Sequence, residues 1–358
     1  MRGFELVRPT AVDLFCGAGG MSLGLSRAGF ELLLGVDADP ACVKTIQANP
    51  RHLDHQVVQT RVEDLGSAGV LELTGLRPGE LDLLAGGPPC QGFSWQRTVG
   101  GDFDDRNDLA LSWAGFVEAL HPRLAMMENV PAITGRRGAP TLAAVVQRLL
   151  AAGYSVEHRV LDAAEFGVPQ RRRRFVLVAW RSDGGIRPFC WPDPLPAPPT
   201  TVRQAIAHLP SPPADGSELP GWPNHRADRL SPINLERIRA LGPGQGREHL
   251  PARLLAPCHR LPAERIGHRG VYGRMAWDEP APTITARFDS FTRGRFGHPD
   301  QDRTISLREG AILQGFPADY VFVGSKVEVA RQIGNAVPPP FAAALGKALA
   351  KTLGGGAA

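Results

Sequence analysis

Residues 11–20 read Ala-Val-Asp-Leu-Phe-Cys-Gly-Ala-Gly-Gly, a short apolar strand that runs directly into a glycine-rich turn. A helical stretch follows to Ala28, and Gly29 ends it. Glycines at such a turn let the backbone approach a ligand at the carboxyl end of a strand. The stretch therefore predicts the first strand, turn and helix of an α/β fold, with a ligand site at the turn.

The same alternation continues through the first half of the chain. We expect further strands at 31–36, 81–85, 124–127 and 175–180, and helices at 40–49, 109–120 and 141–152. Asp39 and Pro40 fit an N-cap followed by proline at the first helical position. Strands that alternate with helices are typical of a doubly wound, mostly parallel sheet.

Composition excludes several classes of protein. The chain has 358 residues, of which 43% are hydrophobic and 21% charged, as in an ordinary globular protein. No apolar run approaches the roughly 18 residues of a membrane span, and the first ten residues lack the apolar core of a signal peptide. We therefore expect a cytoplasmic location. The five cysteines lie far apart without a CxxC pair, which excludes a disulfide framework and a standard zinc site, so no metal is expected.

Composition changes after about residue 184. Residues 188–223 contain 11 prolines, a density that neither a helix nor a sheet interior tolerates. Between residues 221 and 310 there are 15 arginines and no lysine against 10 acidic residues. We expect a domain at about 1–184, an irregular and basic second region from about 185 to about 300, and a regular segment after about 303. The family resemblance described below sets the bounds of these parts at 1–184, 185–297 and 298–358. In that last segment Ser306 and Ser325 each fit a capping box that opens a helix.

An acidic residue lies where a nucleotide-type cofactor would need it. Asp37 ends the second expected strand, 20 residues after Gly17. A carboxylate at this place can accept hydrogen bonds from ribose hydroxyls. The turn at Gly17, Gly19 and Gly20 lacks the GxGxxG spacing of a dehydrogenase, which favours S-adenosylmethionine over NAD. For this motif alone, a tight structural turn with a helix cap remains an alternative.

Two further motifs follow expected strands. Residues 86–94 read Gly-Gly-Pro-Pro-Cys-Gln-Gly-Phe-Ser, a rigid turn that holds the thiol of Cys90 at the carboxyl edge of the sheet. Glu128 and Asn129 end the strand at 124–127 and are expected at the same edge. A carboxyl group in an apolar pocket stays protonated and can donate a proton. A buried structural cysteine and a surface ion pair are the alternatives.

Arginines and a polar turn complete the set of motifs. Residues 170–175 read Gln-Arg-Arg-Arg-Arg-Phe, and strand alternation predicts that Arg172 and Arg174 share one face. A basic run is more commonly a solvated face or a phosphate binder. Residues 331–339 read Arg-Gln-Ile-Gly-Asn-Ala-Val-Pro-Pro, a turn that alone could be an ordinary loop.

These five motifs, in this order, resemble those of the bacterial-type DNA (cytosine-5) methyltransferases. The resemblance covers about 1–184 and 298–358, and the middle region corresponds to the variable target-recognition domain of that family. It implies the fold of S-adenosylmethionine-dependent methyltransferases. It also implies that 298–358 returns to the catalytic domain.

The resemblance implies a covalent mechanism on a flipped-out cytosine of duplex DNA. The Cys90 thiolate would attack C6, and Glu128 would hold or protonate N3. C5 would then take the methyl group, a base would remove the C5 proton and Cys90 would leave. Arg172 and Arg174 match family arginines near the base and the cysteine, and Asn129 would orient the loop of Cys90.

The resemblance also implies a pocket for S-adenosyl-L-methionine, whose product is S-adenosyl-L-homocysteine. The residues expected in that pocket are Phe15, Gly17, Ala18, Gly19, Gly20, Asp37, Ala38, Asp64, Leu65, Pro89, Leu109, Asn335 and Ala336. One departure is Ala38, where some relatives place an aromatic residue that stacks on adenine.

Alternatives stay open at this level. The tRNA-methylating branch of the same family shares these catalytic motifs, and a silent DNA-binding module would share the fold. The length and basic surplus of the middle region favour double-stranded DNA, and the intact motifs favour an enzyme. We expect a monomer without membrane partners. The target sequence is open, and so is the choice between a solitary enzyme and one with a separately acting cognate restriction endonuclease.

Overall fold

The computed structural model describes residues 8–89, 108–183, 186–260 and 270–354. The chain divides into two compact units. The first comprises Met1–Asp162, Arg173–Pro194 and Val337–Ala358, and the second comprises Ala163–Arg172 and Leu195–Ala336. Residues 298–336 thus belong to the second unit by their contacts, although their resemblance is to catalytic motifs. The functional domain ranges stay predictions.

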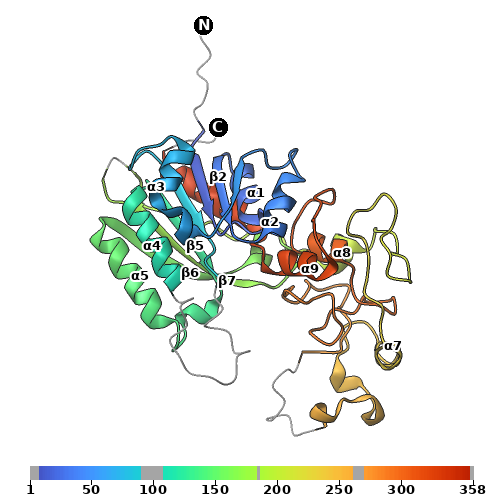
Figure 1. Ribbon diagram of the computed structural model, residues 1–358. Helices are drawn as coiled ribbons and strands as arrows, with labels where there is room; N and C mark the ends of the chain where they lie inside the picture. The colour runs from blue at the N-terminus through green and yellow to red at the C-terminus, as the bar shows by residue number, and fades with distance from the viewer. Residues whose placement is uncertain (1–7, 90–107, 184–185, 261–269, 355–358) are drawn as a thin grey trace. The chain divides into compact units, whose positions relative to one another are not determined.

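The first unit is built on one seven-stranded sheet of order β3-β2-β1-β4-β5-β7-β6 (Figure 1). Its strands are β1 (Thr10–Leu14), β2 (Glu31–Asp37), β3 (Gln56–Gln59), β4 (Leu83–Gly86), β5 (Leu124–Asn129), β6 (Tyr154–Asp162) and β7 (Arg173–Arg181). The first five are parallel, whereas β7 is antiparallel to β5 and β6. The expected doubly wound, mostly parallel sheet is confirmed.

Helices cover both faces of this sheet. They are α1 (Gly20–Arg27), α2 (Pro40–Gln47), α3 (Val62–Thr74), α4 (Asp108–Leu120), α5 (Ala139–Ala151) and α10 (Pro339–Thr352). Helices α3, α4 and α5 share a hydrophobic core with Val12 and Leu14 of β1. Asp13 alternates with those two residues and bonds to Ser22 of α1, so α1 covers the opposite face. Helix α10 packs so closely on α1 that a Cβ at Gly24 would lie 2.4 Å from the Cβ of Ala342.

Three elements of the first unit are not predicted by the sequence pattern: β3, α3 and β6. Strands β3 and β6 are the two edges of the sheet. An edge strand needs no continuous apolar run because one side faces solvent, and Glu157, His158 and Arg159 of β6 are exposed. Helix α3 is interrupted at Gly66, whose φ of 65° and ψ of 169° are not helical.

The second unit contains four α-helices among its described residues: α6 (Val202–Ile206), α7 (Pro232–Arg239), α8 (Leu307–Leu313) and α9 (Lys326–Asn335). Ser306 and Ser325 form the expected capping boxes, with Glu309 and Glu328 as reciprocal partners. A small core gathers under α7 around Ile238 and Phe291. Within the described ranges no helix has the length and apolarity needed to cross a membrane.

Candidate active site

The carboxyl ends of four parallel strands meet at one edge of the sheet. Strands β1, β2, β4 and β5 end there in the glycine turn, Asp37, Gly86 and Asn129. Because β7 is antiparallel to β5, its first residues lie at the same edge, with Phe175 opposite Asn129. In open α/β sheets ligands bind outside the carboxyl ends of the strands. This edge is therefore the candidate site in the first unit.

The glycine turn is held in an unusual backbone conformation. Phe15, Gly17 and Gly19 have φ values of 61°, 54° and 82°. Positive φ is uncommon for a bulky residue such as Phe15 and concentrates at functional sites. A Cβ at Gly17 would meet no atom within 4 Å, so the turn is open on that side. The backbone can therefore approach a ligand closely there.

Asp37 joins the turn to the end of β2. Its Oδ2 accepts the N–H of Gly17 at 2.8 Å, and its Oδ1 accepts the N–H of Asp39 at 2.8 Å. Asp39 in turn caps α2 by accepting the N–H of Ala41. A carboxylate has about four acceptor positions, and these two bonds orient Asp37 beside the glycine turn. The turn and Asp37 fit a nucleoside-type cofactor.

The other expected cofactor residues divide between the two units. Ala18, Gly19 and Gly20 are buried, whereas Ala38, Asp64 and Pro89 are exposed and Leu65 and Leu109 half-buried. All eight belong to the first unit. Asn335 ends α9 and Ala336 caps it, and both belong to the second unit. These pocket assignments stay predictions.

Glu128 and Arg174 form a nearly buried ion pair. Arg174 Nε lies 2.9 Å from Glu128 Oε1, and each side chain is only 12% exposed. Burial lowers the pKa of Arg174, and the attraction of the Glu128 carboxylate opposes that shift. The pair brings the last residues of β5 and the first residues of β7 together at the candidate edge.

Glu128 and Asn129 both reach the turn that precedes Cys90. Asn129 Nδ2 donates to the carbonyl of Pro88 at 3.2 Å. A Cβ at Gly87 would lie 3.6 Å from Glu128 Oε2. The Gly87–Pro88 turn is therefore attached to the end of β5 by a hydrogen bond and lies beside the carboxylate. Cys90 itself lies outside the described residues.

Arg172 does not share a strand face with Arg174, because β7 begins only at Arg173. The prediction from alternation is wrong at this point. Arg172 is 1% exposed and belongs to the second unit. Its guanidinium donates to the carbonyls of Ile284, Gly334 and Ala336 at 2.8–3.0 Å. Arg172 thus holds the C-terminal end of α9, where Asn335 lies.

Two buried polar side chains near the strand ends were not predicted as functional. Asp13 on β1 is fully buried and accepts the hydroxyl of Ser22 at 2.6 Å. Trp113 on α4 is fully buried under the end of β4, where a Cβ at Gly86 would lie 2.8 Å from its ring. An aspartate inside an otherwise apolar strand is a signal that sequence reasoning could have used. The requirement for glycine at residue 86 depends on packing alone.

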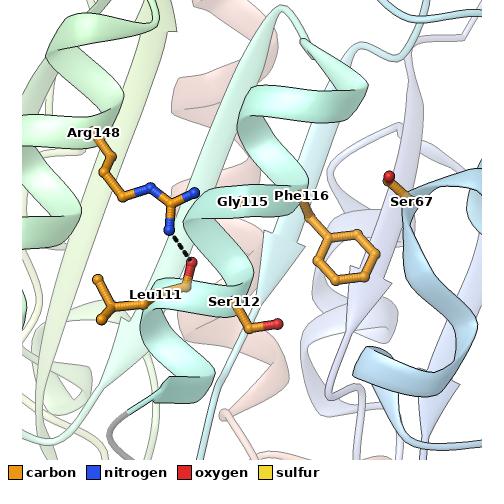
Figure 2. Close-up of a pocket in the computed structure, with 6 residues that line it drawn as sticks. All are labelled: Ser67, Leu111, Ser112, Gly115, Phe116 and Arg148. Carbon is orange, nitrogen blue, oxygen red and sulfur yellow. Dashed lines mark hydrogen bonds between the residues drawn. The ribbon is translucent and has the colours of Figure 1, made fainter.

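A separate pocket of about 460 Å³ opens between helices of the first unit (Figure 2). Its lining residues are Ser67 of α3, Leu111, Ser112, Gly115 and Phe116 of α4, and Arg148 of α5. Arg148 donates to the Leu111 carbonyl at 3.1 Å and forms an ion pair with Glu118, so its charge is compensated. None of the expected site residues lines this pocket.

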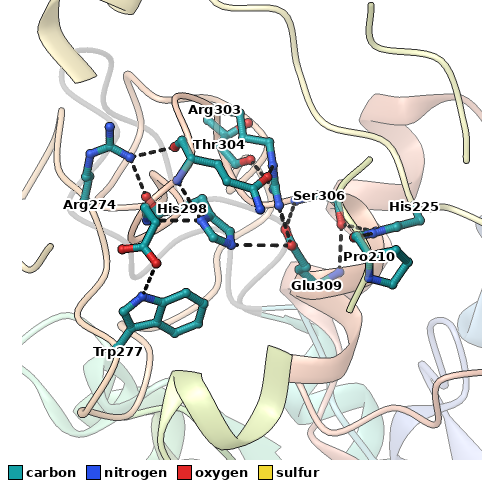
Figure 3. Close-up of polar contacts among 11 residues, drawn as sticks. Pro210, His225, Arg274, Trp277, His298, Arg303, Thr304, Ser306 and Glu309 are labelled. Atoms are coloured by element: carbon teal, nitrogen blue, oxygen red, sulfur yellow. Dashed lines mark hydrogen bonds and ion pairs between the residues drawn. The ribbon is translucent and has the colours of Figure 1, made fainter. Parts of the chain in front are cut away.

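A dense polar network organises the second unit (Figure 3). Arg303 binds both carboxylate oxygens of Glu309 at 2.7 Å, and Glu309 closes the capping box with Ser306. The Ser306 hydroxyl accepts the Glu309 N–H, so its own hydrogen is directed to His225 Nδ1 at 2.8 Å. His225 then donates from Nε2 to the Pro210 carbonyl. Within the described ranges no cluster of His, Cys, Asp and Glu is arranged to hold a metal ion.

His298 in this network makes stability depend on pH. Its Nδ1 accepts the backbone N–H groups of Asp300 and Gln301 at 3.2 and 3.0 Å, so the ring is neutral. Burial lowers the pKa of His298 to about 4. Because the unfolded histidine titrates near 6.5, only the unfolded chain takes up this proton between pH 6.5 and 4. We expect His298 to cost about 2 kcal/mol of stability between pH 7 and pH 5.

The variant His298→Asn tests this expectation, because its amide oxygen can accept the same N–H groups without titrating. Urea unfolding at pH 7 and pH 5 would measure both proteins. Between pH 7 and pH 5 the free energy of unfolding of the wild type should fall by about 2 kcal/mol more than that of the variant. Equal losses would exclude His298 as the cause.

Comparison with known proteins gives consistent matches over nearly the whole chain. The family model of C-5 cytosine-specific DNA methylases matches residues 10–351. The type II methylase M.HgiDII of Herpetosiphon aurantiacus is 37% identical over 347 residues, which cover 96% of this chain and 94% of that protein. The type II methyltransferase M1.HphI of Haemophilus parahaemolyticus is 37% identical over 344 residues, which cover 96% and 87%.

Solved structures share the fold. An E. coli protein described as a DNA modification methyltransferase encoded within a prophage has a TM-score of 0.74 and 25% identity, over 97% of this chain and 99% of that one. A mutant of Spodoptera frugiperda DNMT2 has a TM-score of 0.66 and 17% identity, over 95% of this chain and 99% of that one. The second similarity shows a common fold.

Proposed function

The chain belongs to the C-5 cytosine-specific DNA methylases, and on this premise we propose that it methylates a flipped-out cytosine of duplex DNA through a covalent adduct with Cys90. The members of this family are enzymes that methylate C5 of cytosine in DNA. One observation carries the finer proposal. Glu128 and Asn129, at the end of β5, lie against the Gly87–Pro88 turn that leads directly to Cys90.

The mechanism follows from what these groups can do. The C5 atom of cytosine is a poor nucleophile, so the Cys90 thiolate first adds to C6 and makes C5 electron-rich. As the thiolate adds, protonated Glu128 gives its proton to N3, and the carboxylate that results pairs with Arg174. The proton returns from N3 to Glu128 when Cys90 leaves. After methyl transfer a base removes the C5 proton, and the bond between Cys90 and C6 breaks to restore the ring. Extrusion of the base from the stack is required for this attack.

S-Adenosylmethionine supplies the electrophilic methyl group on its sulfonium. The chain would hold it at the glycine turn, where Gly17 is open and Asp37 is oriented by two backbone N–H groups. Asp64 and Leu65 would lie at the edge of its adenine, and Leu109 would help to complete the pocket. Asn335 and Ala336, which the family pattern also assigns to the cofactor, lie at the end of α9 that Arg172 holds within the second unit.

The basic region supports DNA as substrate. We propose 185–297 as the target-recognition domain, in which side chains near the base edges read the sequence and arginines bind phosphates. The arginine surplus between residues 221 and 310 supports this assignment. A cognate restriction endonuclease that acts separately is proposed as the cellular partner, because the relatives are type II methyltransferases.

The test combines a transfer assay with sequencing. Purified protein would be incubated with labelled S-adenosylmethionine and either duplex DNA or tRNA. Plasmid from an expressing host would then be sequenced after bisulfite treatment. We expect label in DNA and protected cytosines at one short sequence. Label in tRNA alone would contradict the proposed substrate, and binding of cofactor without transfer to either would contradict the enzymatic role.

Asp37→Ala should weaken the binding of S-adenosylmethionine by about 1–3 kcal/mol, the range for losing hydrogen bonds to a charged group. The expected cause is the loss of the ribose acceptor and of the contact with Gly17. Titration calorimetry would measure the affinity. Glu63→Gln, at an exposed carboxylate of the same unit, is the matched control. An unchanged affinity in Asp37→Ala would remove Asp37 from the pocket.

A further inference from the structure

Asp13 is a fully buried acidic residue directly behind the glycine turn. It lies on β1, two residues before Phe15, and is 0% exposed. Its Oδ2 accepts the hydroxyl of Ser22 at 2.6 Å. Its Oδ1 is also buried and has no hydrogen-bond partner within the described residues. Burying a carboxylate oxygen without a hydrogen-bond partner reduces the free energy of unfolding, so Asp13 is unfavourable for stability at this position.

The surroundings of Asp13 contain acidic and neutral groups. Asp13 pairs in register with Gly35 of β2, so Asp37 is on the same face, roughly 8 Å away by strand geometry.

The thiol of Cys16 lies beside Gly35, and burial raises the pKa of this thiol well above the ordinary value, so it stays neutral. Cys42 lies near that thiol on α2, and His55 is also close to Gly35. Burial lowers the pKa of His55 to about 4, so it is neutral as well.

No basic group acts on the Asp13 carboxyl among the described residues. The groups that act on Asp13 are Ser22 and Asp37, and neither is basic. Burial raises the pKa of Asp13 to about 7; the Asp37 charge raises it further, and the Ser22 hydrogen bond opposes the rise. Asp13 therefore changes charge near neutral pH in a place where charge is weakly screened.

We propose that Asp13 gives the glycine turn its preference for the cationic S-adenosylmethionine over its neutral product, S-adenosylhomocysteine. The inference rests on the proposed function, since it takes the turn as the cofactor site. The sulfonium is a permanent positive charge, and the thioether of the product has none. Ionised Asp13 attracts the first ligand and is nearly indifferent to the second. Asp13 is thus a residue of cofactor specificity that reduces inhibition by the product.

The proposal predicts a linkage between proton and cofactor. A bound cation favours ionised Asp13, so the affinity for S-adenosylmethionine rises with pH and levels off above the pKa of the free protein. A shift of one pKa unit on binding corresponds to a tenfold change in affinity. The affinity for S-adenosylhomocysteine should not rise with pH through the ionisation of Asp13.

Calorimetric titrations of the full chain with each ligand at pH 5.5, 6.5 and 7.5 would test this. The measured quantity is the ratio of the dissociation constant of S-adenosylhomocysteine to that of S-adenosylmethionine. We expect this ratio to rise severalfold with pH in the wild type and in Glu72→Gln, an exposed control on α3. In Asp13→Asn, whose amide oxygen can still accept the Ser22 hydroxyl, the severalfold rise should be lost, and only the pH dependence that comes from the ligands themselves should remain. Ionisable groups of the ligands are common to all variants and cancel in the comparison.

Ser22→Ala provides a second test, should Asp13→Asn fold poorly. Loss of the hydroxyl removes a contact that stabilises the ionised carboxylate, so the rise of the ratio should move to higher pH. An unchanged pH dependence in Asp13→Asn, or in Ser22→Ala if the first variant does not fold, overturns the proposal. If the wild type binds neither ligand at any pH, the proposed function fails and this inference fails with it.

Discussion

Cys90→Ser is expected to reduce methyl transfer to the background of the assay while the affinity for S-adenosylmethionine stays near that of the wild type. A serine hydroxyl is far less ionised than a thiol at neutral pH and cannot add to C6 at a useful rate. The cofactor would be held by the turn and Asp37, so its binding does not depend on the thiol.

Transfer of labelled methyl groups to duplex DNA and calorimetry with S-adenosylmethionine would measure the two properties side by side. Cys16→Ser is the matched control, because Cys16 is buried in the turn and burial keeps its thiol protonated. It should retain turnover. Turnover of Cys90→Ser near the wild-type rate would rule out the covalent mechanism.

Glu128→Gln is expected to lower kcat by about 10²–10⁴-fold, the usual contribution of a positioned acid or base. The amide can still accept the Arg174 N–H through its oxygen, but it cannot hold and release a proton at N3. Arg174 also loses its counter-charge while its side chain is only 12% exposed. We therefore expect a parallel loss of about 1–3 kcal/mol in the free energy of unfolding.

Steady-state kinetics with saturating cofactor, together with urea unfolding, would separate the two effects. Glu118→Gln is the matched control, since Glu118 also pairs with an arginine in the first unit but lies on α4, beside the pocket of Figure 2. It should lose stability without losing turnover. A kcat of Glu128→Gln within about threefold of the wild type would remove Glu128 from the chemistry.

Local hydrogen bonds made several features predictable. Asp39 caps α2, and Ser306 and Ser325 form capping boxes, as their spacing predicts. Each of these bonds joins residues two or three positions apart, so the residue types alone contain the information. The glycine turn is also predictable from the residue types, since glycine is favoured in the positive-φ conformation that Gly17 and Gly19 adopt.

Partners that are distant in sequence were not predictable in the same way. Arg172 and Arg174 are two residues apart in one basic run, yet Arg174 pairs with Glu128 of the first unit, whereas Arg172 binds carbonyls of the second. The strand start at Arg173 separates them. The sequence pattern does not predict strand β6, because its pairing depends on β7 and its outer side chains are polar.

The residue pattern alone was sufficient for the α/β class, the order of the motifs and the candidate nucleophile, because these depend on local periodicity and residue chemistry. The tertiary structure decided how the charges are arranged. It buried Asp13 behind the glycine turn with no basic group acting on it among the described residues, paired Glu128 with Arg174, and used Arg172 to hold the end of α9 that contains Asn335. Burial and the distance between charges set electrostatic energies, and both exist only once the chain has folded.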